Sequence, residues 1–184
     1  MHKIRDMIKE LDLNLLKKIY NSLMVKDFPD DELKPFEMIK TFIIEDKSIA
    51  LGYYENDVLK GYATVLYAGN SLLLDYFAII SDYRGRGYGT CFLSELKDYF
   101  KNYDFLLIEA ENNESVTARK RIEFYKRCGC RDSLLRGRLY FVEYVFLYLE
   151  LSDKHNSQMI KEEIVNLYSI IYPHYLNTEY LIFH

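Results

Sequence analysis

A glycine-rich segment, Arg84-Gly85-Arg86-Gly87-Tyr88-Gly89-Thr90, places the tightest limit on how this chain folds. It follows an apolar run at Leu72–Ile80 that is typical of a strand, and it precedes a run at Cys91–Lys101 that is typical of a helix. Glycine lets the backbone turn tightly and bring its N–H groups close to a ligand. A helix N-terminus adds further N–H donors and a partial positive charge. The pattern therefore predicts a phosphate-binding turn, in which Arg84 and Arg86 could pair with phosphate bidentately.

Two well-known phosphate-binding patterns do not match this segment. In a dinucleotide-binding fingerprint the glycines open the first strand–helix unit, and an acidic residue closes the next strand. A nucleoside-triphosphate loop ends in Gly-Lys-Ser/Thr, whereas here Thr90 follows Gly89 directly. A Gly-x-Gly turn before a helix can also be a plain connection between two elements. Taken alone, the segment leaves both interpretations open.

Composition narrows the classes of function. The 184 residues suffice for one domain with a sizeable core, and the net charge of −4 gives no bulk electrostatic case for binding nucleic acid. The three cysteines and four scattered histidines argue against a disulfide scaffold and a metal site. The start of the chain lacks an apolar signal-peptide region, and the longest apolar run, Tyr140–Leu151, is broken by Glu143 and Glu150. We therefore expect a cytoplasmic protein without a membrane, metal or nucleic-acid partner.

Hydrophobic periodicity and turn residues predict a single α/β or α+β domain in which helices are interspersed with strands. We expect Asp12 to cap the first helix, Pro35 to stand near the start of the second, Gly129 to end the fourth and Pro173 to stop the last. The last helix should turn Met159, Ile160, Ile164, Leu167, Tyr168 and Ile171 inward. The expected strands are His2–Ile8, Ser48–Tyr54, Val58–Tyr67, the run ending at Ile80, Phe105–Glu111, and two within Arg131–Leu151 that turn near Gly137. The expected helices are Asp12–Met24, a stretch after Phe28–Glu32 towards Ile44, Cys91–Lys101, Ser115–Cys128 and Ser157–Ile171.

Three motifs resemble those of the GNAT family of N-acetyltransferases. The spacing Ile79-x-x-x-x-Arg84-x-x-Gly87-x-Gly89 is similar to the loop that binds the pyrophosphate of acetyl-CoA in that family. The run Arg121–Gly129 resembles the family's second motif, a helix with a tyrosine that ends in Gly-Phe, except that Cys130 replaces the aromatic residue. The segment Phe28–Leu33 is similar to the loop between the first two helices of many bacterial members.

The resemblance implies a mixed, mostly antiparallel sheet whose fourth and fifth strands splay apart to admit acetyl-CoA. It implies a single acetyltransferase domain over residues 1–184, with a core at about 2–150 and a helical extension at about 157–184. Acetyl-CoA would be the acyl donor, with no metal. By the same likeness, the pantetheine arm would contact the backbone of Phe77, Ala78 and Ile79. The backbone N–H groups that would bind the pyrophosphate are those of Arg84, Gly85, Arg86, Gly87, Tyr88, Gly89 and Thr90.

The resemblance also suggests residues for the chemistry. An attacking amine must first lose its proton, and the departing thiolate must gain one. Tyr125 matches the family's tyrosine that serves as the general acid; composition alone would favour a core aromatic residue on an amphipathic helix, and the motif favours the acid role. Asp75 and Glu111, with Glu109 on the same face as Glu111, are candidate bases, and each could instead be a solvated or salt-bridged carboxylate. Several family members have no dedicated base.

The acceptor would be a primary amine of a small molecule or peptide, and the protein a monomer or homodimer. Candidate residues for the acceptor wall are Phe28, Tyr54, Tyr62 and the segment after Gly137. The basic cluster Arg119–Arg121 lies where a 3′-phosphate could bind, but it could also be a solvated helix face. Two alternatives stay open: a non-catalytic acyl-CoA-binding regulatory module, and an unrelated phosphate-binding protein.

Overall fold

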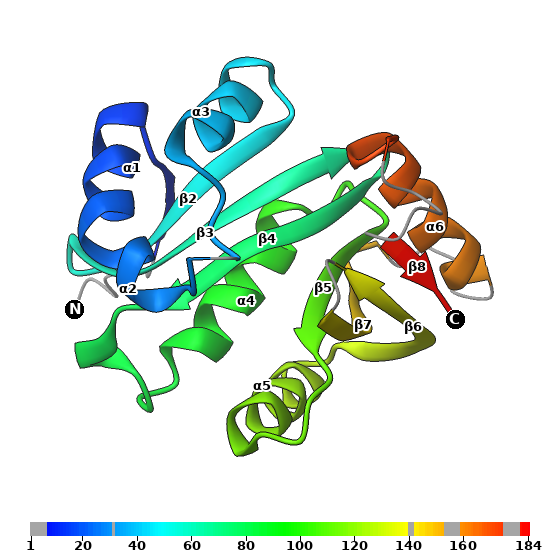
Figure 1. The fold of residues 1–184 in the computed structure, drawn as a ribbon. Helices are drawn as coiled ribbons and strands as arrows, with labels where there is room; N and C mark the ends of the chain where they lie inside the picture. Colours follow the sequence, from blue (N-terminus) through cyan, green and yellow to red (C-terminus); the bar gives the residue numbers. More distant parts are fainter. Residues whose placement is uncertain (1–6, 31, 140–141, 153–158, 175–180) are drawn as a thin grey trace. The chain divides into compact units, whose positions relative to one another are not determined.

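The computed structural model describes residues 7–30, 32–139, 142–152, 159–174 and 181–184. Helices are interspersed with groups of strands along this chain (Figure 1). The strands are β1 (Met7–Glu10), β2 (Ser48–Glu55), β3 (Val58–Ala68), β4 (Ser71–Ile79), β5 (Phe105–Glu111), β6 (Arg131–Leu139), β7 (Val142–Glu150) and β8 (Leu181–Phe183). The α-helices are α1 (Leu13–Ile19), α2 (Val25–Asp27), α3 (Phe36–Ile44), α4 (Tyr88–Tyr99), α5 (Val116–Arg127) and α6 (Ile160–Ile171). A π-helical turn, η1 (Tyr20–Met24), and a 3₁₀ turn, η2 (Ser81–Tyr83), complete the described elements.

The strands of the described residues form one sheet in the order β1-β2-β3-β4-β5-β7-β6-β8. The pairings of β1 with β2, β2 with β3, β5 with β7, and β6 with β7 and β8 are antiparallel. β4 and β5 pair in parallel over Leu72–Leu74 and Leu106–Ile108, and both strands continue beyond that ladder. The predicted mixed, mostly antiparallel fold with flanking helices and an extra C-terminal helix is confirmed. Over the described ranges, every helix falls short of the length and apolarity needed to cross a bilayer.

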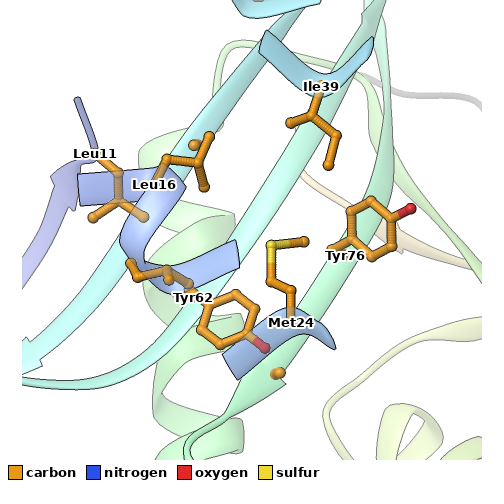
Figure 2. Packing of buried hydrophobic residues seen from close by; sticks show 9 residues of the cluster. Leu11, Leu16, Met24, Ile39, Tyr62 and Tyr76 are labelled. Atoms are coloured by element: carbon orange, nitrogen blue, oxygen red, sulfur yellow. The ribbon is translucent and has the colours of Figure 1, made fainter. Parts of the chain in front are cut away.

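The chain divides into two compact units, residues 1–66 with 75–99 and residues 67–74 with 100–184. In the first unit, helices α1 and α3 lie over one face of the strands, and α4 lies on the other (Figure 1). Figure 2 shows the core beneath α1 and α3, where side chains from helices and strands interdigitate. The buried residues of this core are Leu11, Leu16, Ile19, Met24, Ile39, Ala50, Tyr62, Tyr76 and Ala78. On the opposite face, the ring of Phe92 from α4 stacks on Tyr53 at 5.1 Å and on Phe77 at 5.2 Å.

The N-terminal helical segment begins as predicted and ends differently. The carboxylate of Asp12 accepts a hydrogen bond from Leu15 N at 2.8 Å, which confirms the predicted N-cap. The helix then widens into the π-helical turn Tyr20–Met24 and continues as α2 to Asp27. A π-helical turn inserts one residue per turn, and so it shifts every side chain after it around the helix axis. Asp27, which pairs with Arg84, is the last residue of α2 and follows this turn.

The second unit contains β5, β7, β6 and β8 together with α5 and α6. Helix α6 buries Ile160, Ile164, Leu167 and Tyr168. The ring of Tyr168 lies 5.8 Å from Phe146 and 5.3 Å from Phe183. Strand β8, which sequence patterns did not predict, pairs with β6 over Gly137–Leu139.

Several details differ from the sequence-based expectation; for example, β1 ends at Glu10 and not at Ile8. Helix α4 begins at Tyr88 instead of Cys91, because the first turn of a helix tolerates Gly89 and Thr90. Gly137 lies inside β6 and not in a turn; the connection to β7 falls at residues 140–141, which are outside the described residues. Met159 is 59% exposed, because it precedes the first turn of α6 and therefore misses the buried stripe. The expected strand at residues 2–6 and the helix start at 157–158 also lie outside the described residues.

Gly137 is required by a close approach. A Cβ built there would lie 2.8 Å from the carbonyl oxygen of Ile182 and 3.0 Å from Cε2 of Phe146. We expect Gly137→Ala to destabilise the fold by about 1–3 kcal/mol in chemical denaturation, because a backbone atom of β8 would have to move. Leu134→Gly on the same strand is the control, since Leu134 is 68% exposed at a φ of 61°. That variant should unfold at the same or a higher denaturant concentration, and equal losses in both variants would contradict the prediction.

The three cysteines differ in accessibility. Cys91 is exposed, Cys128 is partly buried and Cys130 is buried. Burial raises the pKa of the Cys130 thiol to about 12, so roughly one part in ten thousand is thiolate at pH 8. Only the thiolate is a strong nucleophile. Cys130 should therefore be chemically inert in the folded protein.

We expect alkylation of the folded protein at pH 8 to label Cys91 rapidly and to leave Cys130 unmodified until denaturant is added. Peptide mass mapping after timed iodoacetamide treatment would locate the labels. Cys91→Ser should remove the fast reaction, and Cys130→Ser should leave it intact. Rapid labelling of Cys130 in the folded state would contradict the prediction that burial protects this thiol.

Candidate functional site

The glycine-rich segment forms an uncovered turn in the first unit. Gly85 and Gly87 adopt φ angles of 74° and 86°, in the left-handed region that favours glycine. A Cβ built on either residue would meet no atom within 4 Å. The side chains of Arg84 and Arg86 are exposed as well. The peptide groups of this turn are therefore open to a ligand.

Helix α4 starts immediately after the turn. Cys91 N, in the first turn of this helix, donates a hydrogen bond to the carbonyl oxygen of Gly87 at 3.1 Å. The N–H groups of the residues before Cys91 point out of the N-terminal end of the helix, where the helix dipole is positive. The turn and the helix end together provide the donors and the charge that suit a phosphate or pyrophosphate group.

The side chain of Arg84 holds the start of the turn in place. Its Nε donates to the carbonyl oxygen of Ile79 at 2.7 Å, and its Nη2 pairs with Oδ1 of Asp27 at 2.5 Å. Tyr62 donates its hydroxyl hydrogen to the other oxygen of Asp27, at 2.6 Å. Burial, followed by this hydrogen bond, raises the pKa of Tyr62. Arg84 thus uses its guanidinium within the protein, while no ion pair with Arg86 is recorded among the described residues.

Strand β4 leads into the turn. Phe77 and Ile79 are partly buried, and Ala78 is buried on the opposite face, where it belongs to the core of Figure 2. Asp75, a candidate base, has a side chain that is 8% exposed and pairs with Nζ of Lys34 at 2.5 Å. This contact matches the salt-bridged alternative for Asp75, because an ammonium already holds the carboxylate.

Tyr125 lies in the second unit, on helix α5. The helix starts next to Ser115, close to the predicted start, and the hydroxyl of Ser115 caps it by accepting from Ala118 N at 3.0 Å. Gly129 ends it at a φ of 92°. Tyr125 is 7% exposed, and burial raises its pKa above the ordinary value for a phenol. The phenol therefore stays protonated at neutral pH.

The two glutamates of β5 have different surroundings. Glu111 is partly buried and accepts a hydrogen bond from Nδ2 of Asn113 at 2.9 Å. Glu109 is contacted by the hydroxyl of Tyr168, which belongs to helix α6. Tyr168 is fully buried, and its pKa lies well above the ordinary value, first because of burial and then because of the charge on Glu109.

The structure places the candidates in two groups. The first unit holds Asp75, Phe77, Ala78, Ile79 and the segment Arg84–Thr90, and the second holds Glu111 and Tyr125. Sequence reasoning missed four side chains that contact these candidates or support the turn: Asp27, Lys34, Lys60 and Tyr168. Each is separated from its partner by more than 20 positions, so no local spacing could have indicated it.

Comparisons with known proteins agree with this fold. A family model described as the acetyltransferase (GNAT) family matches residues 13–130. A comparison with curated protein sequences gave no match.

Several solved structures share the architecture. A protein assigned to the GNAT acetyltransferases from Bacteroides thetaiotaomicron superposes with a TM-score of 0.73 at 18% identity, covering 90% of this chain and 98% of its own. A ribosomal-protein-alanine N-acetyltransferase from Escherichia coli gives a TM-score of 0.61 at 18% identity, with 80% and 95% covered. Spermidine N-acetyltransferase from Vibrio cholerae, in complex with CoA and spermine, gives 0.60 at 14% identity, with 79% and 95% covered. At sequence identities of 14–18%, the similarity to these structures shows a shared fold and no more.

The family match spans well over half of the chain and includes the turn before α4 and the helix of Tyr125. With a mixed sheet in which β4 runs parallel to β5, and an open glycine turn at a helix N-terminus, this chain belongs to the GNAT family of acetyltransferases.

Proposed function

We propose that this protein transfers the acetyl group of acetyl-CoA to a primary amine of a small molecule or peptide, by direct attack within a ternary complex. The observation that carries the proposal is the turn at Gly85 and Gly87, whose surroundings are empty where a side chain would stand. It lies at the N-terminus of α4 in a chain of the GNAT family, whose members use acetyl-CoA.

The residues of the first unit fit the donor. A pyrophosphate is an anion with several acceptor oxygens, and it would take hydrogen bonds from the N–H groups of residues 84–90. Arg86, exposed beside the turn, would add a positive charge. The pantetheine arm would lie along the backbone of Phe77, Ala78 and Ile79. A backbone N–H on that strand would stabilise the oxyanion that forms when the amine attacks the thioester.

Two proton transfers complete the reaction. The attacking amine must be neutral, and Glu111, whose recorded partner is the neutral amide of Asn113, would accept its proton through water. Asp75 would serve less well, because Lys34 already neutralises its charge. The CoA thiolate would take a proton from Tyr125, since burial keeps that phenol protonated at neutral pH.

An amine acceptor is in keeping with the structural neighbours. Their names describe acetylation of spermidine and of an alanine in a ribosomal protein. Both acceptors present an amine that is an ammonium ion at neutral pH, so an enzyme acting on either must bind a cation and then remove a proton.

Two observations favour a second function, a non-catalytic acyl-CoA-binding module. The carboxylate of Asp75 is held in an ion pair, and Tyr125 is buried. The two functions differ in the release of free CoA thiol. Incubation of the protein with acetyl-CoA and a panel of polyamines, aminoglycosides, amino acids and peptides should release thiol if it is an enzyme. Tight CoA binding with no release across the panel would favour the binding module.

Substitution of a glycine tests the role of the turn in CoA binding. We expect Gly87→Ala to raise the dissociation constant for CoA about tenfold in titration calorimetry, because the new methyl group and the altered φ would obstruct the phosphate seat. Gly69→Ala is the matched control, since Gly69, in the turn between β3 and β4, also has a positive φ of 63°, and a Cβ there would make only an ordinary contact with Ile170 at 4.0 Å. Both variants should lose about 1 kcal/mol of stability, and only Gly87→Ala should lose affinity. If Gly87→Ala and Gly69→Ala bound CoA with equal affinity, the turn would not be part of the donor site.

Removal of the phenolic hydroxyl tests the acid role of Tyr125. If its phenol protonates the leaving thiolate, Tyr125→Phe should lower kcat roughly a hundredfold and leave CoA affinity nearly unchanged. Tyr99→Phe, which removes an exposed hydroxyl bonded to Glu10, should leave kcat unchanged.

The pH profile gives an independent check on Tyr125. An acid acts only while it is protonated, and a raised pKa extends the protonated range upward. The decline of kcat that is due to Tyr125 should therefore begin only above about pH 10. A wild-type rate in Tyr125→Phe would exclude the acid role.

A further inference from the structure

We propose that Lys60 is a positioning residue that holds the phosphate-binding turn in its open shape. Lys60 lies on β3, which sequence motifs do not connect to the turn. Its ammonium group contacts both the residue before Arg84–Gly87 and the residue after it. The inference rests on the proposed function, because it assigns a support to the same donor site.

An irregularity in the sheet directs this side chain. β2 and β3 pair Tyr53 with Gly61 but Tyr54 with Leu59, so Lys60 is the extra residue of a β-bulge. Leu59 packs against the core beneath α1 and α3, whereas a Cβ on Gly61 would face Phe92 of α4. The bulge changes the alternation between these two residues. It allows Lys60 to reach η2 and the first turn of α4, and the carbonyl oxygen of Lys60 accepts from Ile80 N at 2.9 Å.

The ammonium of Lys60 is buried and has specific partners. Lysine is rarely buried unless its charge is paired, and Lys60 is only 8% exposed. Its Nζ lies 3.8 Å from the ring centroid of Tyr83 and 5.5 Å from that of Tyr88, which are cation–π distances. The same Nζ lies 3.8 Å from Oε2 of Glu55, and that oxygen accepts the hydroxyl hydrogen of Tyr88 at 2.6 Å.

These contacts bracket the turn. Tyr83 ends the 3₁₀ turn just before Arg84, and Tyr88 is the first residue of α4. Between them, a Cβ built on Gly85 or Gly87 would meet no atom within 4 Å, and the carbonyl oxygen of Gly87 is bonded to Cys91 N. Contacts at the two ends of the turn therefore do most to set its shape. The ammonium of Lys60 contacts the tyrosine rings at both ends, and a turn that is already shaped loses less entropy when it binds a ligand.

The test compares variants of three kinds in the full chain. Lys60→Met keeps a long apolar side chain and removes the charge. Lys60→Arg keeps a cation that can lie over an aromatic ring. Lys9→Met is the matched control: Lys9 also lies over a tyrosine, Tyr54 at 5.0 Å, and pairs with a carboxylate, Asp57 at 2.9 Å, but on β1.

Titration calorimetry with CoA reports both the affinity and the fraction of competent protein. We expect Lys60→Met to raise the dissociation constant at least about tenfold with a stoichiometry near one, while Lys60→Arg stays within about threefold of wild type and Lys9→Met matches it. The melting temperature of Lys60→Met should fall, because the variant removes one partner of an ion pair and leaves the carboxylate of Glu55 without that cation. In assays with an amine that the wild-type protein acetylates, Lys60→Met should have a higher KM for acetyl-CoA and an unchanged kcat.

Other outcomes would overturn the proposal. If Lys60 only stabilised the fold, Lys60→Met would show a lower stoichiometry or a lower kcat. Its dissociation constant for CoA and its KM for acetyl-CoA would then be unchanged. An affinity of Lys60→Met equal to that of Lys9→Met would also exclude the positioning role. If the wild-type protein itself fails to bind CoA, the proposed function fails, which is a different result from a loss confined to Lys60→Met.

Discussion

Peptide N–H groups bind an anion only where no side chain covers them, and this constraint underlies the candidate donor site. The turn before α4 meets it with two glycines at positive φ, followed by a helix end that concentrates further donors. The same openness leaves the turn without packing of its own. Its conformation must come from neighbouring elements, and the charged and polar contacts around it supply that support.

Two sets of contacts reach the turn from separate parts of the first unit. Arg84 is held by Asp27 at the end of α2, with Tyr62 on the same carboxylate. Tyr83 and Tyr88 are held by Lys60 at the bulge of β3. In each set one charged member is largely buried, Asp27 at 13% and Lys60 at 10% side-chain exposure, and such a group is costly to leave without its partner. We infer that these ion pairs fix the conformation of the turn more than they add to the stability of the fold.

The C-terminal extension contributes to the second unit in a similar way. Helix α6 packs an apolar face, but it also brings the hydroxyl of Tyr168 to Glu109 on β5. Strand β8 then pairs with β6 where Gly137 permits a close approach. The extension is therefore an integral layer of this unit, and it determines which of the two β5 glutamates has a phenol as its partner.

The sequence by itself determined the features that depend on neighbouring residues. Periodicity located most helices and strands, Asp12 and Ser115 marked helix starts, and the spacing around Gly87 indicated the phosphate turn and the GNAT fold. These are local effects of backbone and side-chain chemistry, and so a linear pattern records them. The assignments of Tyr125, Asp75 and Glu111 to chemical steps stay predictions.

Only the tertiary structure decided the features that need distant partners. The three-residue strand β8 exists because β6 offers it an edge, and Gly137 could be read as a turn until that partner was known. The ion pair between Asp75 and Lys34 joins residues 41 positions apart, and the contact between Arg84 and Asp27 joins residues 57 apart. A β-bulge directs Lys60 towards the turn. Folding brings such groups together because a buried charge requires a partner, and the sequence alone does not specify which of many possible partners it meets.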